Sequence, residues 1–317
     1  MSDNSIHWAD KKEVAVLSWQ LRFTFFAACH FPVFLKNAFA MVITAFYFAF
    51  LKKERKASRD FLKRCRGKAS LLDSYKHFLS FSLALMEKCY CWSGKASISQ
   101  IETQRDDMDE LCKGLESGEG CLMICSHLGN IEYLWSSAAF NKTHVKREFE
   151  IYPIADTSIT PKQNYLLNRG ALNSLGKIID ANSIGPETAA LLSEKLSAGN
   201  IAIIAGDRIS ANTRNRTVPV QFLGKQAHFP FGVFALASAL KVPVYFVFAM
   251  REKNFSFSSA CRMRVHKARN AMQGSYLDRK RKIPDLAKEF ASFLEYYCLK
   301  EPMQWYNFYD FWAEAKI

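Results

Sequence analysis

Apolar segments and amphipathic segments alternate along most of the chain, which predicts strands and helices in turn. Apolar runs that predict strands lie at 121–126, 149–154, 177–180, 201–206, 218–223, 242–250 and 255–265. Helical patterns lie at 70–92, 106–116, 162–175, 186–198, 233–240 and 284–299. Strands that alternate with helices form a sheet covered on both faces. We therefore expect a mixed α/β fold with a largely parallel central sheet.

The N-terminal part is different, because it is hydrophobic without this alternation. Residues 38–51 contain no charge and would form roughly 21 Å of helix, against a bilayer hydrocarbon core of about 30 Å. Such a segment favours a tilted anchor or a helix in the membrane plane, and a buried core helix is the alternative. We divide the chain into an N-terminal membrane-associating helical segment, 1–69, and one α/β domain, 70–317.

The candidate chemistry begins where the first strand of this domain ends. His127 follows the apolar run, Gly129 and Asn130 suit a tight turn and a helix N-cap, and Glu132 falls in the first helical turn. Since the carboxyl ends of strands next to helix N-termini usually hold the chemistry of α/β proteins, His127 and Glu132 form the predicted catalytic pair. A buried core histidine is the alternative.

Further candidates follow the strand 201–206. Asp207 and Arg208 emerge at the edge of the sheet where His127 emerges, so they can bind substrate or form a structural pair with each other. Arg214 and Arg216 lie in a polar loop, where they are solvated residues or contacts of an anionic acceptor. His228 can line the pocket or be structural. Asn130 completes the predicted substrate-binding set.

The formal net charge of +13 is concentrated in two segments. Residues 52–68 hold nine basic and two acidic residues, and residues 251–282 hold ten basic and two acidic ones. Such patches indicate an anionic partner, such as lipid head groups, an acidic carrier protein or nucleic acid. No pattern of a nucleic-acid-binding motif accompanies the charge, and one patch directly follows the hydrophobic segment, so we expect no nucleic acid.

Nine cysteines are scattered without metal-ligand spacing, so we expect no metal and no cofactor. An odd number of cysteines without a secretory signal favours a reducing compartment.

Five segments in one order resemble the lysophospholipid acyltransferase superfamily, and within it the branch of the lipid A late acyltransferases. They are Ser126-His127-Leu128-Gly129-Asn130-x-Glu132, Gly206-Asp207-Arg208, Phe222-Leu223-Gly224 with Phe229-Pro230-x-Gly232, Val242-Pro243-Val244, and the aromatic tail that starts at Gln304-Trp305. The glutamate in the first motif favours the lipid A branch over the glycerolipid enzymes.

The resemblance implies a membrane-associated acyltransferase at the cytoplasmic face of the inner membrane. It would move a fatty acyl chain from a thioester, on acyl carrier protein rather than coenzyme A, to a hydroxyl or amine of a lipid or glycolipid acceptor. His127 would be the general base and Glu132 would orient its ring. The alternative is a thioesterase that uses the same residues on water. We expect a monomer.

Overall fold

A seven-stranded mixed sheet is the centre of the computed structural model, which describes residues 18–96, 101–103, 107–139, 145–156, 178–209, 215–269 and 274–313. The strand order is β1-β9-β8-β2-β5-β3-β4. Among the described pairs of this sheet, β8 and β9 are antiparallel and the others are parallel. The predicted fold class is therefore confirmed.

The strands of this sheet are short and mostly buried. They are β1 (Ile101–Thr103), β2 (Cys121–Gly129), β3 (Ile151–Ala155), β4 (Ile179–Asp180), β5 (Ile201–Ala205), β8 (Val244–Arg251) and β9 (Cys261–Lys267). A separate antiparallel hairpin consists of β6 (Thr217–Phe222) and β7 (Lys225–Pro230). The hairpin turn includes Gly224, which has a φ of 77°.

Helices account for most of the remaining described chain. They are α1 (Ser18–His30), α2 (Val33–Phe50), α3 (Lys52–Arg66), α4 (Leu71–Trp92), α5 (Met108–Glu116), α6 (Glu132–Ala139), α8 (Pro186–Ser197), α9 (Phe231–Leu240) and α10 (Tyr276–Lys300). Two of them begin with a capping box, in which a serine hydroxyl and an aspartate carboxylate satisfy each other's backbone N–H groups: Ser70 with Asp73 and Ser275 with Asp278.

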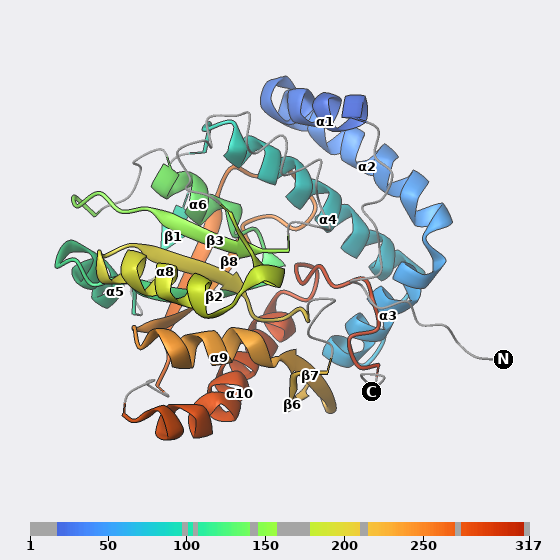
Figure 1. Ribbon diagram of the computed structural model, residues 1–317. Helices are drawn as coiled ribbons and strands as arrows, with labels where there is room; N and C mark the ends of the chain where they lie inside the picture. Colours follow the sequence, from blue (N-terminus) through green and yellow to red (C-terminus); the bar gives the residue numbers. More distant parts are fainter. Residues whose placement is uncertain are drawn as a thin grey trace.

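Both faces of the sheet carry a hydrophobic core. Successive side chains of β2 point to opposite faces, so they belong alternately to the two cores. Leu122 and Ile124 belong to the core that α8, α9 and α10 cover, together with the hairpin and the C-terminal tail. Met123 and Cys125 belong to the core that α5 and α6 cover. Figure 1 shows α9 and α10 on one side of the sheet, α4 and α6 on the other, and α1 and α2 outside α4.

Several predicted boundaries need correction. The last helix begins at Tyr276 and not near Pro284, because the capping box at Ser275 starts it two turns earlier and the helix continues through the proline. The last strand is β9, at 261–267, and not 255–265. The apolar N-terminal helix begins at Val33, five residues before the uncharged run. The predicted helix 162–175 lies outside the described residues.

Candidate active site

β2 bulges immediately before its end. Cys125 lies opposite Val247 and Gly129 lies opposite Ala249, so four steps along β2 correspond to two steps along β8. The extra residues include His127, whose side chain leaves the regular alternation of the strand. The sequence predicted that His127 ends the strand, whereas in the structure it lies within this irregular end of β2.

Gly129 allows the bulge to close against β8. Its φ is 75°, and a Cβ atom at this position would lie 1.9 Å from the carbonyl oxygen of Ala249. The next residue donates its backbone N–H to the same carbonyl, with 2.7 Å between Asn130 N and Ala249 O. The position therefore requires glycine for both its conformation and its space.

The imidazole of His127 is held by Asp207. Asp207 follows β5, which is the parallel neighbour of β2. Its Oδ1 lies 2.8 Å from Nδ1 of His127, and its Oδ2 accepts a hydrogen bond of 2.9 Å from the His127 backbone N–H. Since an ionised carboxylate can only accept hydrogen bonds, Nδ1 carries the proton and Nε2 has the free lone pair.

The C-terminal tail fixes Asp207 from the other side. Trp305 is fully buried, and its indole Nε1 donates to Oδ2 of Asp207 over 2.9 Å. The tail also pairs with the end of β2, because Gly129 N donates to Gln304 O and Tyr306 N donates to His127 O. His127, Asp207 and Trp305 thus form one hydrogen-bonded unit from three distant parts of the chain.

This unit favours a neutral imidazole beside an ionised carboxylate. Burial lowers the pKa of His127 below 6.5, and the positive charges of Arg208 and Lys88 lower it further, while Asp207 opposes them. Burial alone would raise the pKa of Asp207, but its electrostatic interaction and hydrogen bonds with His127, together with the Arg208 charge, outweigh burial and lower that pKa. The His127 side chain keeps 34% of its surface accessible, so a substrate can reach it.

The prediction that Glu132 holds the His127 ring needs correction, because Asp207 occupies that position. Glu132 is in the first turn of α6, as predicted, but its Oε1 lies 2.5 Å from the Lys88 Nζ on α4. Its side chain is 6% exposed, and Oε2 has no hydrogen-bond partner among the described residues. Glu132 therefore pairs with a cation from a different element and keeps one buried acceptor oxygen.

Asn130 has the structural role that its position predicted. Its Oδ1 accepts a hydrogen bond of 3.2 Å from the Glu132 backbone N–H, which belongs to the first turn of α6. Its side chain is buried, and its Nδ2 lies 3.5 Å from the carbonyl oxygen of Ala84 on α4. Asn130 therefore fixes the direction in which α6 leaves the bulge.

A comparison of the chain with models of known protein families shows which class of protein has this site. The model of the bacterial lipid A biosynthesis acyltransferase family matches residues 9–313. The chain belongs to this family. It is therefore an acyltransferase, and the predicted lipid A branch is confirmed. No curated protein matches the chain significantly.

In this acyltransferase Arg208 reaches the tail as well. Its Nη2 donates to the carbonyl oxygen of Tyr306 over 2.8 Å. This carbonyl lies one residue beyond Trp305, so Arg208 and Asp207 hold consecutive residues of the tail. After burial, the charge of this guanidinium is the next cause of the lowered pKa of His127.

The remaining predicted residues lie outside this unit. His228 is on β7, where its Nδ1 lies 3.0 Å from the Thr217 hydroxyl across the hairpin. Arg216 is exposed at the start of the hairpin, and its carbonyl accepts the N–H of Phe231. Arg214 lies outside the described residues. None of these contacts connects His228 or Arg216 to His127.

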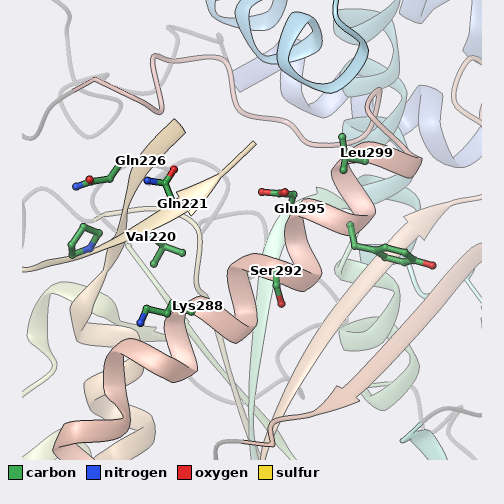
Figure 2. A pocket seen from close by; sticks show the side chains of 9 residues that line it. Val220, Gln221, Gln226, Lys288, Ser292, Glu295 and Leu299 are labelled. Carbon is green, nitrogen blue, oxygen red and sulfur yellow. The ribbon is translucent and has the colours of Figure 1, made fainter. Parts of the chain in front are cut away.

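A groove on the acyltransferase surface is separate from the His127 unit. It lies between the β6–β7 hairpin and α10, has a volume of about 640 Å³, and includes Gln221, Glu295 and Leu299 in its lining (Figure 2). Glu295 is engaged by the turn of the hairpin, because Leu223 N donates to its Oε2 over 2.6 Å. No predicted site residue lines this groove.

Sequence reasoning missed Lys88 and the roles of Trp305 and Tyr306. Lys88 belongs to a long amphipathic helix and carries no motif that separates it from other lysines. The aromatic tail was a segment of the resemblance only, and the structure shows that its Trp305 is fully buried. Within the described residues no group of histidine, cysteine, aspartate and glutamate side chains could hold a metal ion.

Proposed function

We propose that this acyltransferase uses His127 as a general base to move a fatty acyl chain from a thioester to a hydroxyl or amine of a lipid or glycolipid acceptor. The observation that supports this role is the hydrogen bond between Nδ1 of His127 and Oδ1 of Asp207, at 2.8 Å. It fixes the tautomer that leaves Nε2 able to take a proton, which is the arrangement of a base and its orienting acid.

The proposed reaction needs no covalent enzyme intermediate. The acceptor oxygen or nitrogen attacks the thioester carbonyl while Nε2 of His127 takes its proton. The carbonyl electrons collapse back, the carbon–sulfur bond breaks, and the imidazolium returns the proton to the leaving thiolate. Asp207 stabilises the imidazolium between these steps.

Arg208 and Glu132 are proposed to handle the charges of the substrates. A guanidinium has five N–H donors, so Arg208 can bind a phosphate or the developing oxyanion while it holds the tail. The buried Oε2 of Glu132 can accept a hydrogen bond from a polar group of the acceptor. Arg214, Arg216 and His228 remain proposed contacts of an anionic acceptor.

The donor and the location are part of the same proposal. Seven basic residues of the 52–68 segment are exposed: Lys52, Lys53, Lys56, Arg59, Lys63, Arg66 and Lys68. These charges suit acyl carrier protein, which is strongly acidic, and also the anionic surface of the inner membrane at its cytoplasmic side. Among the described residues one helix, α2, is long and apolar enough to cross a membrane.

The experiment is acyl transfer by purified protein with acyl carrier protein and coenzyme A thioesters offered in parallel. His127→Ala should lower kcat/KM by about a thousand-fold. His266→Gln, a change on β9 outside the site, should not lower it. Since the pKa of His127 lies below 6.5, the acid limb of the wild-type profile should also lie below pH 6.5.

Unchanged turnover by folded His127→Ala would refute the proposed base. Release of free fatty acid at the full rate without an acceptor would show a thioesterase instead. Mass spectrometry of lipids from cells with and without the protein identifies the acceptor, because the product carries both the acceptor and the added chain.

A further inference from the structure

The helix α2 has one strongly apolar face that no described part of the protein covers. Phe34, Met41, Val42, Phe46 and Phe50 are between 47% and 69% exposed. At 100° per residue these positions fall on one side of the helix. We call these five residues the outer face of α2. Uncovered apolar surface of this extent on a folded protein marks a contact with a membrane or another protein.

The opposite side of α2 is polar and is bound to the domain. Thr44 is 1% exposed, and its hydroxyl donates to the Ser82 hydroxyl on α4 over 2.8 Å. Asn37 Nδ2 donates to the Ser256 hydroxyl over 2.9 Å, and Asn37 Oδ1 accepts from Phe257 N over 2.8 Å.

Lys36 completes this polar stripe. It is 6% exposed, and its Nζ lies 4.0 Å from the ring centroid of Phe257 and 5.1 Å from that of Tyr90. Lys36, Asn37 and Thr44 lie on the same side of α2, opposite the outer face. The helix is thus attached to the domain by a cation and by directional hydrogen bonds as well as by apolar packing.

α2 packs along α4 from one end of α2 to the other. Near the N-terminal end of α2, Lys36 meets Tyr90, and near its C-terminal end the Phe48 ring meets the rings of Tyr75 and Phe78. The two helices are therefore antiparallel neighbours (Figure 1). α4 in turn carries Lys88, whose Nζ contacts Glu132 near the His127 site.

This arrangement is incompatible with a simple span. The 18 residues of α2 correspond to about 27 Å, nearly the thickness of the hydrocarbon core. If α2 crossed the membrane in this packing, α4 would cross beside it and carry Lys76, Glu87 and Lys88 into the hydrocarbon. Each charged side chain at the centre of a bilayer is costly, so the packed structure favours a helix that lies parallel to the surface.

We propose that α1 and α2 lie in the plane of one anionic leaflet, with the outer face of α2 inserted and α4 above it. α1 contributes Trp19, Phe23 and Phe26, which are between 42% and 63% exposed. α3 follows α2 directly and exposes Lys52, Lys53 and Lys56 at the level of the head groups. This location rests on the proposed membrane-bound acyl transfer, since it brings the His127 site to the surface that holds a lipid acceptor.

The test is a measurement of depth. Single nitroxide labels are placed at the exposed positions 35, 42 and 49, which lie within about 40° of one another around the helix, after replacement of the partly exposed Cys29, Cys65 and Cys112 by alanine. The protein is bound to vesicles of phosphatidylglycerol and phosphatidylethanolamine. An in-plane helix gives three similar, shallow depths by electron paramagnetic resonance. A spanning helix gives a deep label at 42 and shallow labels at 35 and 49, which would overturn the proposal.

Two sets of variants test the contributing surfaces. Phe34→Asp with Val42→Asp should lower vesicle binding more than ten-fold, whereas Leu191→Asp, an exposed leucine on α8 that is 44% accessible, should leave it unchanged. Changing Lys52, Lys53 and Lys56 to glutamine should lower binding to anionic vesicles by about five-fold per charge and leave binding to phosphatidylcholine vesicles unchanged.

The binding experiments are repeated with His127→Ala, so that they do not depend on chemistry. If the labels lie at the same depth in His127→Ala, the in-plane position of α2 is supported whatever the transfer assay shows. A spanning depth profile in a protein that still transfers acyl chains would refute the position and leave the function. A lipid-free dimer in which Val42 labels lie together would also overturn the proposal, because a second copy would then cover the outer face.

Discussion

Asp207 is the residue on which the geometry of the candidate active site depends, because its two oxygens accept three hydrogen bonds. Oδ1 accepts from Nδ1 of His127, and Oδ2 accepts from the His127 backbone N–H and from Nε1 of Trp305. All three donors are nitrogen atoms with one hydrogen each. A carboxylate can accept hydrogen bonds from all three donors at once. An amide cannot, because its NH₂ group is a donor and not an acceptor.

Asp207→Asn tests this dependence. The amide oxygen of asparagine must take the place of Oδ2, where two N–H groups point, so the NH₂ group faces Nδ1 of His127. The ring then accepts at Nδ1 and carries its proton at Nε2, which is the wrong tautomer for a base. We expect kcat/KM to fall by about 10³-fold to 10⁴-fold while the protein stays folded.

Glu132→Gln is the matched comparison, since it also replaces a buried carboxylate by an amide of equal size. Its oxygen can still accept from Lys88, so the loss in kcat/KM should be smaller than for Asp207→Asn. An equal or larger loss in Glu132→Gln would mean that Glu132, and not Asp207, is the acid on which the base depends.

At the scale of elements, the bulge of β2 places His127, the proposed base. A regular strand would direct His127 into one of the two cores of the sheet, because alternate side chains of β2 point into one or the other. The bulge interrupts this alternation, and the tail then covers the irregular backbone by pairing at Gly129 and His127. The position of the base thus depends on the closure of the bulge at Gly129.

Gly129→Ala should therefore be among the most damaging small substitutions. The added methyl group meets the Ala249 carbonyl at 1.9 Å, and the backbone must keep a φ of 75°. We expect a loss of more than about 4 kcal/mol in the free energy of unfolding, measured by denaturant titration in detergent.

Gly67→Ala is the control for this substitution, because Gly67 has a φ of 77° and nothing within 4 Å of the added carbon. It should cost about 1 kcal/mol, which is the price of the backbone conformation alone. Equal losses in the two variants would show that the close approach to β8 does not determine the requirement for glycine.

The sequence predicts elements better than it predicts the contacts between them. The apolar run before His127 and the glycine after it are local signals, and they located the strand, the turn and the helix. Asp207 is 80 residues from His127 and Trp305 is 98 residues from Asp207. Spacing along the chain favoured the nearer Glu132 as the orienting acid. In the structure Asp207, just after the neighbouring parallel strand β5, makes the hydrogen bond to the His127 ring.

At the scale of the whole molecule, buried polar contacts join the N-terminal helices, the sheet and the tail. Arg251, at the end of β8, is fully buried and binds Glu87 of α4 through two nitrogens, at 2.6 and 2.8 Å. Its backbone N–H donates to the Gln304 side chain over 2.7 Å. Loss of either charge would leave the other buried without its partner, so this pair ties α4, on which α1 and α2 pack, to the central sheet.

His77 of α4 makes the second such connection, and it is sensitive to acid. Its Nε2 lies 3.0 Å from the carbonyl oxygen of Trp305, and its Nδ1 lies 3.0 Å from the Ser58 hydroxyl of α3. Complete burial lowers its pKa to about 4, although the bond to Trp305 opposes the shift. His77 is therefore neutral in the folded protein at pH values where it is protonated in the unfolded chain.

The sign of the pH dependence follows directly. Between pH 6.5 and about 4 the unfolded state binds a proton at His77 that the folded state does not, so stability is complete above pH 6.5 and falls as the pH decreases to about 4. The shift in the pKa of His77 corresponds to about 3 kcal/mol in the free energy of unfolding.

Unfolding titrations of the wild type and of His77→Gln at pH 7, 5.5 and 4 measure this pH dependence. The variant should be less stable at pH 7 and lose less stability on acidification. Parallel pH curves would show that His77 does not carry this linkage. Because His77 holds the carbonyl of Trp305, whose indole holds Asp207, the wild-type protein should lose the His127 site along with the tail as this stability is lost.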